Sequence, residues 1–294
     1  YPIRLSYHYW KITGDTKPFD SNWKKAIELV LKTFKEQQRK HDKGPYKFER
    51  RTSWATDGVP LGGYGYPAKP VGLIFSMFRP SDDATIFPFL IPSNFFAVVS
   101  MQQAADMLKA IYKDETTAAQ CAALATEVNK ALQQYAIVQH PHFGKVYAYE
   151  VNGYGSFNLM DDANVPGLLS LPYLGAVKNT DPVYVNTRKL LLSEYNPFFF
   201  KGSAGEGIGG PHAGIDLIWP MSIIIRAMTS NNDQEIRECV RTLQHSHAGT
   251  GFMHETFHKN DVTKFTRKWF AWANTLFGEL LYELWKNKPQ LLNG

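Results

Sequence analysis

The amino-acid sequence predicts a mainly α-helical fold, and three observations support that prediction. Apolar residues recur every three or four positions along several segments, a spacing that places them on one face of a helix. Loops rich in glycine, proline and aspartate separate these segments. Only residues 145–157 alternate as a strand does, with the hairpin-turn pair Asn152-Gly153 inside them. No shift in composition marks a boundary, so we expect residues 1–294 to form one domain with a small β-hairpin.

The predicted helices follow the apolar spacing in chain order. Residues 23–34, 95–112, 124–132 and 236–243 repeat in steps of three or four, and residues 265–284 form the longest apolar stripe. Asp261 and Thr263 are expected to cap that last helix. Shorter helices are expected over residues 4–13, 164–177, 183–192 and 215–228, which makes nine in all.

The composition is that of a globular protein. Hydrophobic residues make up 44% and charged residues 20% of the chain. No run approaches the roughly 18 apolar residues that a membrane span needs. Cys121 and Cys239 lie in helical segments and are expected to be buried free thiols. Because the chain starts at Tyr1 rather than Met, the sequence leaves the compartment open between the cytoplasm and a periplasmic or secreted location.

The net charge of +5 comes from a single stretch of the chain. Residues 24–51 hold ten Lys/Arg and four Asp/Glu, a net charge of +6, so the remainder is close to neutral. Apolar residues such as Trp23, Ile27 and Leu31 give the same stretch a core-facing side. We therefore expect a solvated helix face rather than a site for a polyanion, and no nucleic-acid partner.

The segment His254-Glu-Thr-Phe-His258 matches the H-E-x-x-H pattern of zinc hydrolases. That pattern binds zinc when both histidines lie one turn apart on a continuous helix, with the glutamate activating water. Glycines precede the segment and Asn260-Asp261 follow it, so we expect a loop and no bound metal. A zinc hydrolase stays open as an alternative.

Residues 205–210 contain the spacing G-x-G-x-x-G. This spacing binds dinucleotides only when it follows a strand within a strand–helix–strand unit, and the chain shows no such alternation. We expect instead a flexible loop that carries His212 to a cleft, and no cofactor.

Carboxylates gather in three loops, each shortly before a predicted helix. These are Asp82 and Asp83, the pair at residues 161–162, and Glu255 between its histidines. Glycoside hydrolysis needs two carboxyl groups across a cleft, one protonated and one ionised. Repulsion between adjacent aspartates raises the pKa of one of them, as a general acid requires. Aspartate before a helix is also an ordinary N-cap, and that alternative stays open for each of them.

Several of these motifs together resemble glycoside hydrolase family 125, the exo-acting α-1,6-mannosidases. The resemblance runs in the same order over nearly the whole chain. It is carried by Phe78-Arg-Pro-Ser-Asp-Asp-Ala84, Ile91-Pro-Ser-Asn94, Met160-Asp-Asp-Ala-Asn-Val-Pro166, Leu171-Pro-Tyr-Leu-Gly175, His254-Glu-Thr-Phe-His258 and Phe265-Thr-Arg-Lys-Trp-Phe-Ala-Trp-Ala-Asn274.

The resemblance implies an (α/α)6 barrel of twelve helices and an inverting mechanism without metal or cofactor. It implies that the general acid belongs to the pair Asp82 and Asp83, with Asp82 favoured, and that Glu255 is the general base. The implied substrate is an α-1,6-linked mannose oligosaccharide or the mannose of an N-glycan. Candidates to bind mannose hydroxyls are Arg79, Asp162, Asn164, His212 and His254, and candidates to stack on the sugar are Trp54 and Tyr64.

The chain departs from the family in one respect. Family members are longer and carry near their start a Trp-Leu-Arg-Asp segment that helps to form the mannose pocket, and this sequence has none. Together with nine predicted helices instead of twelve, this implies a barrel short of its N-terminal part, whose activity alone stays open. A non-catalytic carbohydrate-binding module is the alternative from another class.

Overall fold

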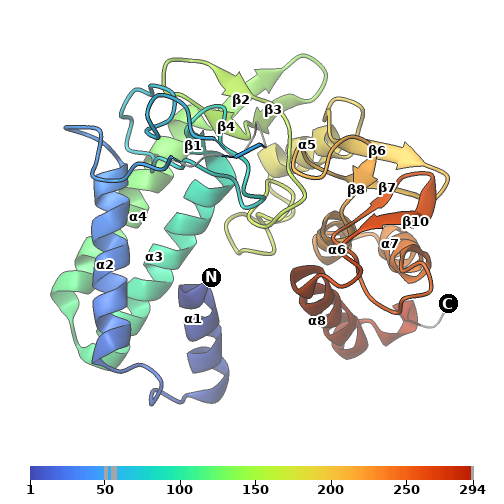
Figure 1. Ribbon diagram of the computed structural model, residues 1–294. Helices are drawn as coiled ribbons and strands as arrows, with labels where there is room; N and C mark the ends of the chain where they lie inside the picture. Colours follow the sequence, from blue (N-terminus) through green and yellow to red (C-terminus); the bar gives the residue numbers. More distant parts are fainter. Residues whose placement is uncertain (50–51, 54–57, 293–294) are drawn as a thin grey trace.

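The computed structural model describes residues 1–49, 52–53 and 58–292, and over these it holds eight α-helices (Figure 1). Their bounds differ from the predicted ones mainly at the ends. In order they are α1 (Pro2–Thr13), α2 (Ser21–Gln37), α3 (Ile91–Tyr112), α4 (Glu115–Tyr135), α5 (Pro182–Leu191), α6 (Pro220–Met228), α7 (Asp233–Ser246) and α8 (Ala271–Asn287), followed by the short 3-10 helix η2 (Pro289–Leu291).

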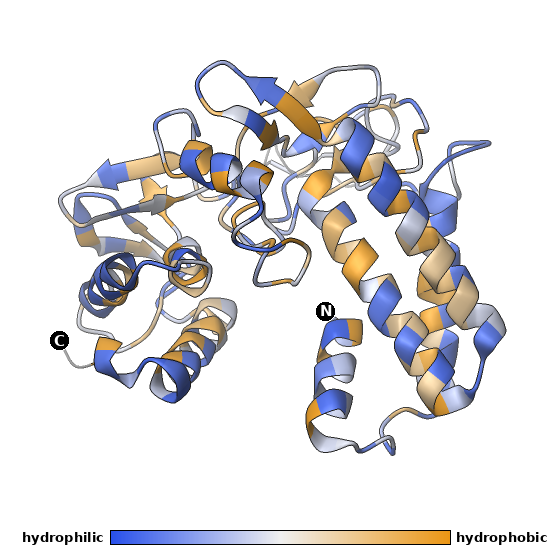
Figure 2. Cartoon of the chain, turned by 180° about the vertical axis from the view of Figure 1, so that it is seen from behind, coloured by the Kyte–Doolittle hydropathy of each residue, from blue (hydrophilic) through white to orange (hydrophobic). Residues whose placement is uncertain are grey.

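The helices stand in two groups. Helices α1 to α4 form one group and α6 to α8 the other, while the strands and long loops lie between the two groups at one end (Figure 1). Most helices carry both hydrophobic and hydrophilic residues (Figure 2). The hydrophilic residues face water, whereas the buried apolar residues of both groups, from Ile3 to Leu291, belong to one core cluster. The loops that carry the predicted carboxylates lie at the end where the strands gather.

Side-chain caps fix where several helices begin. Asp20 accepts hydrogen bonds from the backbone N–H groups of Asn22 and Trp23 at the start of α2. Asp114, Asp181 and Asn232 do the same for α4, α5 and α7. A cap satisfies N–H groups that have no partner inside the helix.

The strands are short and pair only in the antiparallel sense. Two three-stranded sheets have the orders β1-β4-β5 and β10-β9-β8, and two hairpins are β2–β3 and β6–β7. The bounds are β1 (Phe89–Leu90), β2 (Ile137–His140), β3 (Gly144–Tyr147), β4 (Glu150–Val151), β5 (Phe157–Asn158), β6 (Phe199–Gly202), β7 (Gly205–Ile208), β8 (Leu217–Ile218), β9 (Thr256–His258) and β10 (Asp261–Thr266).

The predicted hairpin is confirmed. Strands β4 and β5 pair with Glu150 opposite Asn158, and the turn between them contains Asn152 and Gly153. Gly153 has a φ of 76°, and a Cβ there would lie 2.7 Å from the carbonyl oxygen of Lys69. Glycine is therefore required at this position both by the turn and by the neighbouring backbone.

The helix predicted over residues 164–177 is wrong, since this segment forms a series of turns. The carboxylate of Asp161 accepts hydrogen bonds from the backbone N–H groups of Leu168 and Leu169 at 2.8 and 2.9 Å. These side-chain bonds replace the bonds that a helix would make. Pro166 and Pro172 also lack the N–H that a helix interior needs.

Two other predicted helices begin later than the apolar spacing indicated. Residues 217–218 form β8, so the helix predicted from residue 215 begins at Pro220. Residues 261–266 form β10, so the last helix begins at Ala271, and the predicted capping role of Asp261 and Thr263 is wrong. In both places pairing with β9 prevailed over helical spacing, a tertiary effect that periodicity does not detect.

Both cysteines are buried and free, as predicted. Burial raises the pKa of the Cys121 thiol to about 11 and that of Cys239 to about 12. Both thiols are therefore protonated and unreactive near neutral pH. Among the described residues, no helix is both long and apolar enough to cross a bilayer.

Candidate active site

The first carboxylate loop is a tight hairpin. Phe78 and Ala84 pair across it, the N–H of Arg79 donates to the carbonyl of Asp83, and the N–H of Asp82 donates to the carbonyl of Arg79. Asp82 has a left-handed φ of 71°. Its side chain is exposed, whereas those of Ser81 and Asp83 are buried. The two adjacent aspartates therefore occupy different environments.

The second loop meets the first through Ser81. The hydroxyl of Ser81 lies 2.5 Å from Oδ2 of Asp162 and 3.1 Å from Oδ2 of Asp83, so it links two buried carboxylates. Oδ1 of Asp162 accepts from the backbone N–H and the side-chain amide of Asn164. Asp162, itself bound by Asn164, thus fixes the hairpin through its hydrogen bond with Ser81.

A glycine-containing loop, residues 209–214, follows β7 and lies directly on Asp162. A Cβ added to Gly210 would lie 3.2 Å from Oδ1 of Asp162, closer than most side-chain contacts. The N–H of Ala163 also donates to the carbonyl of Gly209. The small size of Gly210 therefore allows the 209–214 loop to approach the loop of Asp162. This approach brings His212 to the carboxylates.

His212 contacts a carboxylate of the first loop. Its Nδ1 lies 3.8 Å from Oδ1 of Asp83, and the side chain of His212 is 30% exposed. Asp83 is the largest cause of a raised pKa of His212; partial burial opposes the shift, and the charges of Glu255 and Asp82 add to it. Of the carboxylates that the sequence singled out for catalysis, Asp83 is the one in measured contact with this imidazole.

Glu255 stands just before β9 and is 7% exposed. Its N–H donates to the carbonyl of Thr266 at 3.2 Å, which fixes the backbone at the edge of the strand pair. Oε1 of Glu255 lies 3.2 Å from Nε of Arg267, a residue with a left-handed φ of 43°. The carboxylate of Glu255 is thus held by one guanidinium at the surface of the site.

A buried ion pair supports the hairpin from the inner side. Nε of Arg79 lies 2.7 Å from Oε1 of Glu150, and both side chains are almost completely buried. The guanidinium of Arg79 lies 5.4 Å from the centre of the Tyr149 ring, and burial raises the pKa of Tyr149 well above its ordinary value. Sequence reasoning missed Tyr149 and Glu150. The detectable signal was an acidic residue within the alternating 145–157 segment.

The buried aspartate pair is shifted toward the neutral form. Burial raises the pKa of Asp161 to about 7, although the N–H groups of Leu169 and Leu168 favour its ionised form. Burial also raises the pKa of Asp162, against the hydrogen bonds from Asn164 and Ser81. Asp161 thus organises the 161–169 turn, whereas Asp162 faces the carboxylate loops.

The H-E-x-x-H segment does not form a helix. Residues 256–258 are strand β9, so the two histidines are not one helical turn apart. Nδ1 and Nε2 of His254 lie within hydrogen-bond distance of the carbonyls of Lys268 and His247, and its ring stacks on Phe265. His254 therefore presents no ring nitrogen to a metal. No group of three or more His, Cys, Asp or Glu in the described part of the chain is arranged to hold a metal ion.

The G-x-G-x-x-G segment begins within a hairpin strand. Residues 205–208 form β7, which pairs with β6, so the expected flexible loop is confined to residues 209–214. His212 lies in this loop, and its predicted approach to a cleft stays a prediction. No helix starts directly after these glycines, as a dinucleotide site would require.

Of the two predicted stacking residues, only Tyr64 is described, and it does not join the cluster. Trp54 lies outside the described residues. Tyr64 lines a different cavity, where its ring lies 5.9 Å from the guanidinium carbon of Arg39 and 5.5 Å from Nζ of Lys43. Arg79, Asp162, Asn164 and His254 are all buried around the carboxylates, and His212 is the half-exposed member of the predicted binding set.

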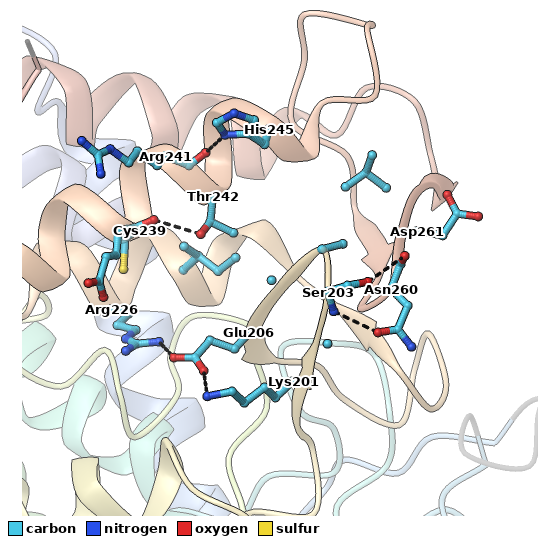
Figure 3. A pocket seen from close by; sticks show the side chains of 16 residues that line it. Lys201, Ser203, Glu206, Arg226, Cys239, Arg241, Thr242, His245, Asn260 and Asp261 are labelled. Atoms are coloured by element: carbon cyan, nitrogen blue, oxygen red, sulfur yellow. Dashed lines mark hydrogen bonds and ion pairs between the residues drawn. The ribbon is translucent and has the colours of Figure 1, made fainter. Parts of the chain in front are cut away.

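Another polar cavity, of about 920 Å³, lies between the β6–β7 hairpin, α7 and the turn after β9 (Figure 3). Within it Glu206 binds both Lys201 and Arg226, each at 2.9 Å or less. The hairpin packs closely here, since a Cβ on Gly205 would lie 2.9 Å from the Thr242 methyl group. None of the carboxylates that the sequence singled out for catalysis lines this cavity.

Comparisons with known proteins show the family of the chain. The sequence profile described as "Metal-independent alpha-mannosidase (GH125)" matches residues 1–282. The "Meiotically up-regulated gene 157 protein" of Schizosaccharomyces pombe is 46% identical over 301 residues, which cover 99% of this chain and 59% of that protein. The chain therefore spans about 59% of the length of this curated relative.

Two solved structures are similar to the chain. One is a Streptococcus pneumoniae protein from a family of metal-independent alpha mannosidases, in a non-productive complex with alpha-1,6-mannobiose. It is 36% identical with a TM-score of 0.95, over 98% of this chain and 68% of that one. The other is a bacterial glucoamylase with acarbose, 16% identical with a TM-score of 0.53, over 66% of this chain and 33% of that one. The second likeness concerns the fold alone.

Proposed function

Because the chain belongs to glycoside hydrolase family 125, the metal-independent α-mannosidases, we propose that it removes terminal α-1,6-linked mannose from an oligosaccharide or N-glycan. The observation that carries this proposal is the family match over residues 1–282, and the contact of 3.8 Å between Nδ1 of His212 and Oδ1 of Asp83 agrees with a site at the first carboxylate loop. The alpha-1,6-mannobiose bound by the pneumococcal relative supports the choice of linkage. We also propose that the eight helices belong to an (α/α)6 barrel, which the TM-score of 0.95 to that relative supports.

Asp82 is the proposed general acid. Its carboxyl is exposed at the end of the first hairpin, where it can reach the oxygen of a glycosidic bond. Asp83 points inward to Ser81 and His212, so it is proposed to position the hairpin rather than to protonate the leaving group. The acid donates its proton to the departing oxygen as the bond to the anomeric carbon breaks.

Glu255 is the proposed general base. Ionised, it removes a proton from a water molecule that attacks the anomeric carbon on the face opposite the leaving group. This attack inverts the configuration, so a product released from an α-linkage is β-mannose. Room for the water requires the carboxyls of Asp82 and Glu255 to lie roughly 6.5–9.5 Å apart when substrate is bound.

The other predicted residues are proposed to act around this pair. His212, half-exposed beside Asp83, is proposed to bind a mannose hydroxyl directly. Arg79, Asp162, Asn164 and His254 are buried and hydrogen-bonded to the protein, so their proposed role is to position the loops. No residue is assigned to hold a metal or cofactor, because the proposed chemistry consists of two proton transfers.

The test is hydrolysis of α-1,6-mannobiose by the full-length protein in the presence of EDTA. We expect wild-type turnover with EDTA, and a fall of about 10²–10⁴-fold in kcat for Glu255→Gln and for Asp82→Asn. Asp106→Asn serves as the control, because Asp106 is an exposed carboxylate on α3 outside the site. Wild-type turnover in both site variants would show that the assignment is wrong, and loss of activity with EDTA would favour a zinc hydrolase.

A further inference from the structure

The basic stretch of residues 24–51 is not a uniform positive surface. Four lysines of this stretch form ion pairs with carboxylates. The pairs are Lys24 with Asp114, Lys32 with Glu36, Lys40 with Glu127 and Lys47 with Glu49. Arg39 and Lys43 make no ion pair with any carboxylate in the described part of the chain. Arg39 and Lys43 therefore lie close together in the sequence just after α2 without a carboxylate partner among the described residues.

Arg39 is turned inward by an unusual backbone. It has a left-handed φ of 49° directly after the end of α2. Its guanidinium carbon lies 3.6 Å from the centre of the Phe75 ring, and Nη1 donates to the carbonyl of Tyr64 at 2.8 Å. The left-handed conformation costs energy in a residue with a side chain, so the contacts of the guanidinium must offset that cost.

One edge of this guanidinium has no partner. Nε and Nη2 of Arg39 are buried and make no hydrogen bond. These two N–H groups form the edge that binds two oxygens of one carboxylate or phosphate in parallel. The other substantially buried arginines have carboxylates, namely Arg79 with Glu150, Arg188 with Glu235 and Arg226 with Glu206 and Glu235. Burial also lowers the pKa of Arg39, which shows how poorly its charge is solvated.

A cavity of about 480 Å³ lies at this guanidinium. Its lining includes Arg39, Lys43, Tyr64, Tyr66 and Phe75. Nζ of Lys43 lies 5.5 Å from the centre of the Tyr64 ring and stays exposed. The volume falls within the range of small-molecule sites.

Asp42 is the one acidic residue in the described lining of this cavity, and no ion pair joins it to Arg39 or Lys43. Oδ1 of Asp42 accepts a hydrogen bond from the N–H of Gly44 at 2.7 Å, so this carboxylate caps its own turn. Lys40 is bound to Glu127, which leaves Arg39 and Lys43 as two cations at one cavity.

We propose that this cavity binds a phosphate group carried on a sugar. Arg39 and Lys43 supply two positive charges against the one negative charge of Asp42, and the unpartnered edge of Arg39 matches two phosphate oxygens once the buried guanidinium turns toward the cavity. Tyr64 and Tyr66 offer aromatic faces of the kind that stack on sugar rings. The choice of a sugar as the carrier rests on the proposed mannosidase function, whereas the phosphate site itself does not.

The test is calorimetric titration of the full-length protein with mannose 6-phosphate and, separately, with inorganic phosphate. We expect saturable binding of both, with mannose 6-phosphate the tighter ligand. Arg39→Gln is expected to weaken both by about tenfold or more, because a bidentate charged contact is lost. Lys43→Gln changes only an exposed side chain and is expected to weaken binding by a smaller factor.

Lys25→Gln is the matched control. It removes the same charge from the same basic stretch, but at the opposite end of α2, about 20 Å away. Binding in this variant is expected to equal that of the wild type, and thermal unfolding checks that each variant is folded. Absence of saturable binding overturns the proposal. Binding by Arg39→Gln and Lys43→Gln that equals that of the wild type also overturns it. Equal affinity for the two ligands overturns the sugar carrier. Because no step measures hydrolysis, these results are independent of the proposed activity.

Discussion

At the scale of single residues, neighbours in the sequence acquire separate roles from their backbone conformation. Asp82 and Asp83 are chemically identical and adjacent, so the sequence alone did not separate them. The left-handed φ of Asp82 places its side chain outward, while that of Asp83 lies beneath, beside Ser81 and His212. This separation follows from the turn, and a sequence motif does not reveal it.

The pH dependence of His212 tests this arrangement. Its pKa in the folded protein is raised above the ordinary value of about 6.5 by Asp83. Stability from this pair is therefore complete below pH 6.5 or so and is lost as the pH rises through the raised value. An NMR titration of the His212 ring protons should give the raised value in the wild type and a lower one in Asp83→Asn. An unchanged titration in that variant contradicts the contact, and Asp106→Asn is the control.

The buried pair of Arg79 and Glu150 gives a second prediction. Removal of one partner leaves an uncompensated charge in the core, so Glu150→Gln is expected to lower the free energy of unfolding by about 3–5 kcal/mol. The double variant Arg79→Met/Glu150→Gln should recover part of that loss, since no buried charge remains. Urea unfolding of the full-length protein measures both. If the single variant costs less than about 1 kcal/mol, the pair does not have the burial described here.

At the scale of elements, helices were predictable wherever the apolar spacing was uninterrupted. Helices α2, α3, α4 and α7 were all anticipated from steps of three and four, whereas the caps Asp20, Asp114 and Asn232 of α2, α4 and α7 were not predicted. The failures share one cause. Within residues 164–177, the side chain of Asp161 accepts hydrogen bonds from backbone N–H groups. Residues 217–218 and 261–266 pair as strands with β9 instead of forming helix. Local periodicity carries no information on such partners.

The close approach of the 209–214 loop to the loop of Asp162 is testable at Gly210. Alanine there would press on the Asp162 carboxylate, since its Cβ would lie 3.2 Å from Oδ1. We expect Gly210→Ala to lower kcat/KM for α-1,6-mannobiose by about tenfold, because a small displacement of His212 disturbs the reacting geometry. Gly58→Ala is the matched control, as nothing lies within 4 Å of a Cβ at that position. Equal kinetics in the two variants would show that the loop contact is not needed.

At the scale of the whole molecule, the family and the helical class were predictable and the helix count was not. The motifs that identified the family lie in loops and in parts of α3, β9, β10 and α8, and the profile match over residues 1–282 confirmed that identification. The eight helices and four small antiparallel sheets of the described residues depend on contacts between distant segments, such as β8 with β9. The buried layer of Tyr149 and Glu150 was missed for the same reason.

The anomeric form of the first product tests the proposed mechanism most directly. The full-length protein, with EDTA present, would be mixed with α-1,6-mannobiose and followed by proton NMR before the released sugar mutarotates. A single displacement by water activated by Glu255 predicts β-mannose as the first-formed product. Release of α-mannose would contradict the paired roles of Asp82 and Glu255, because retention requires a second displacement through a covalent intermediate.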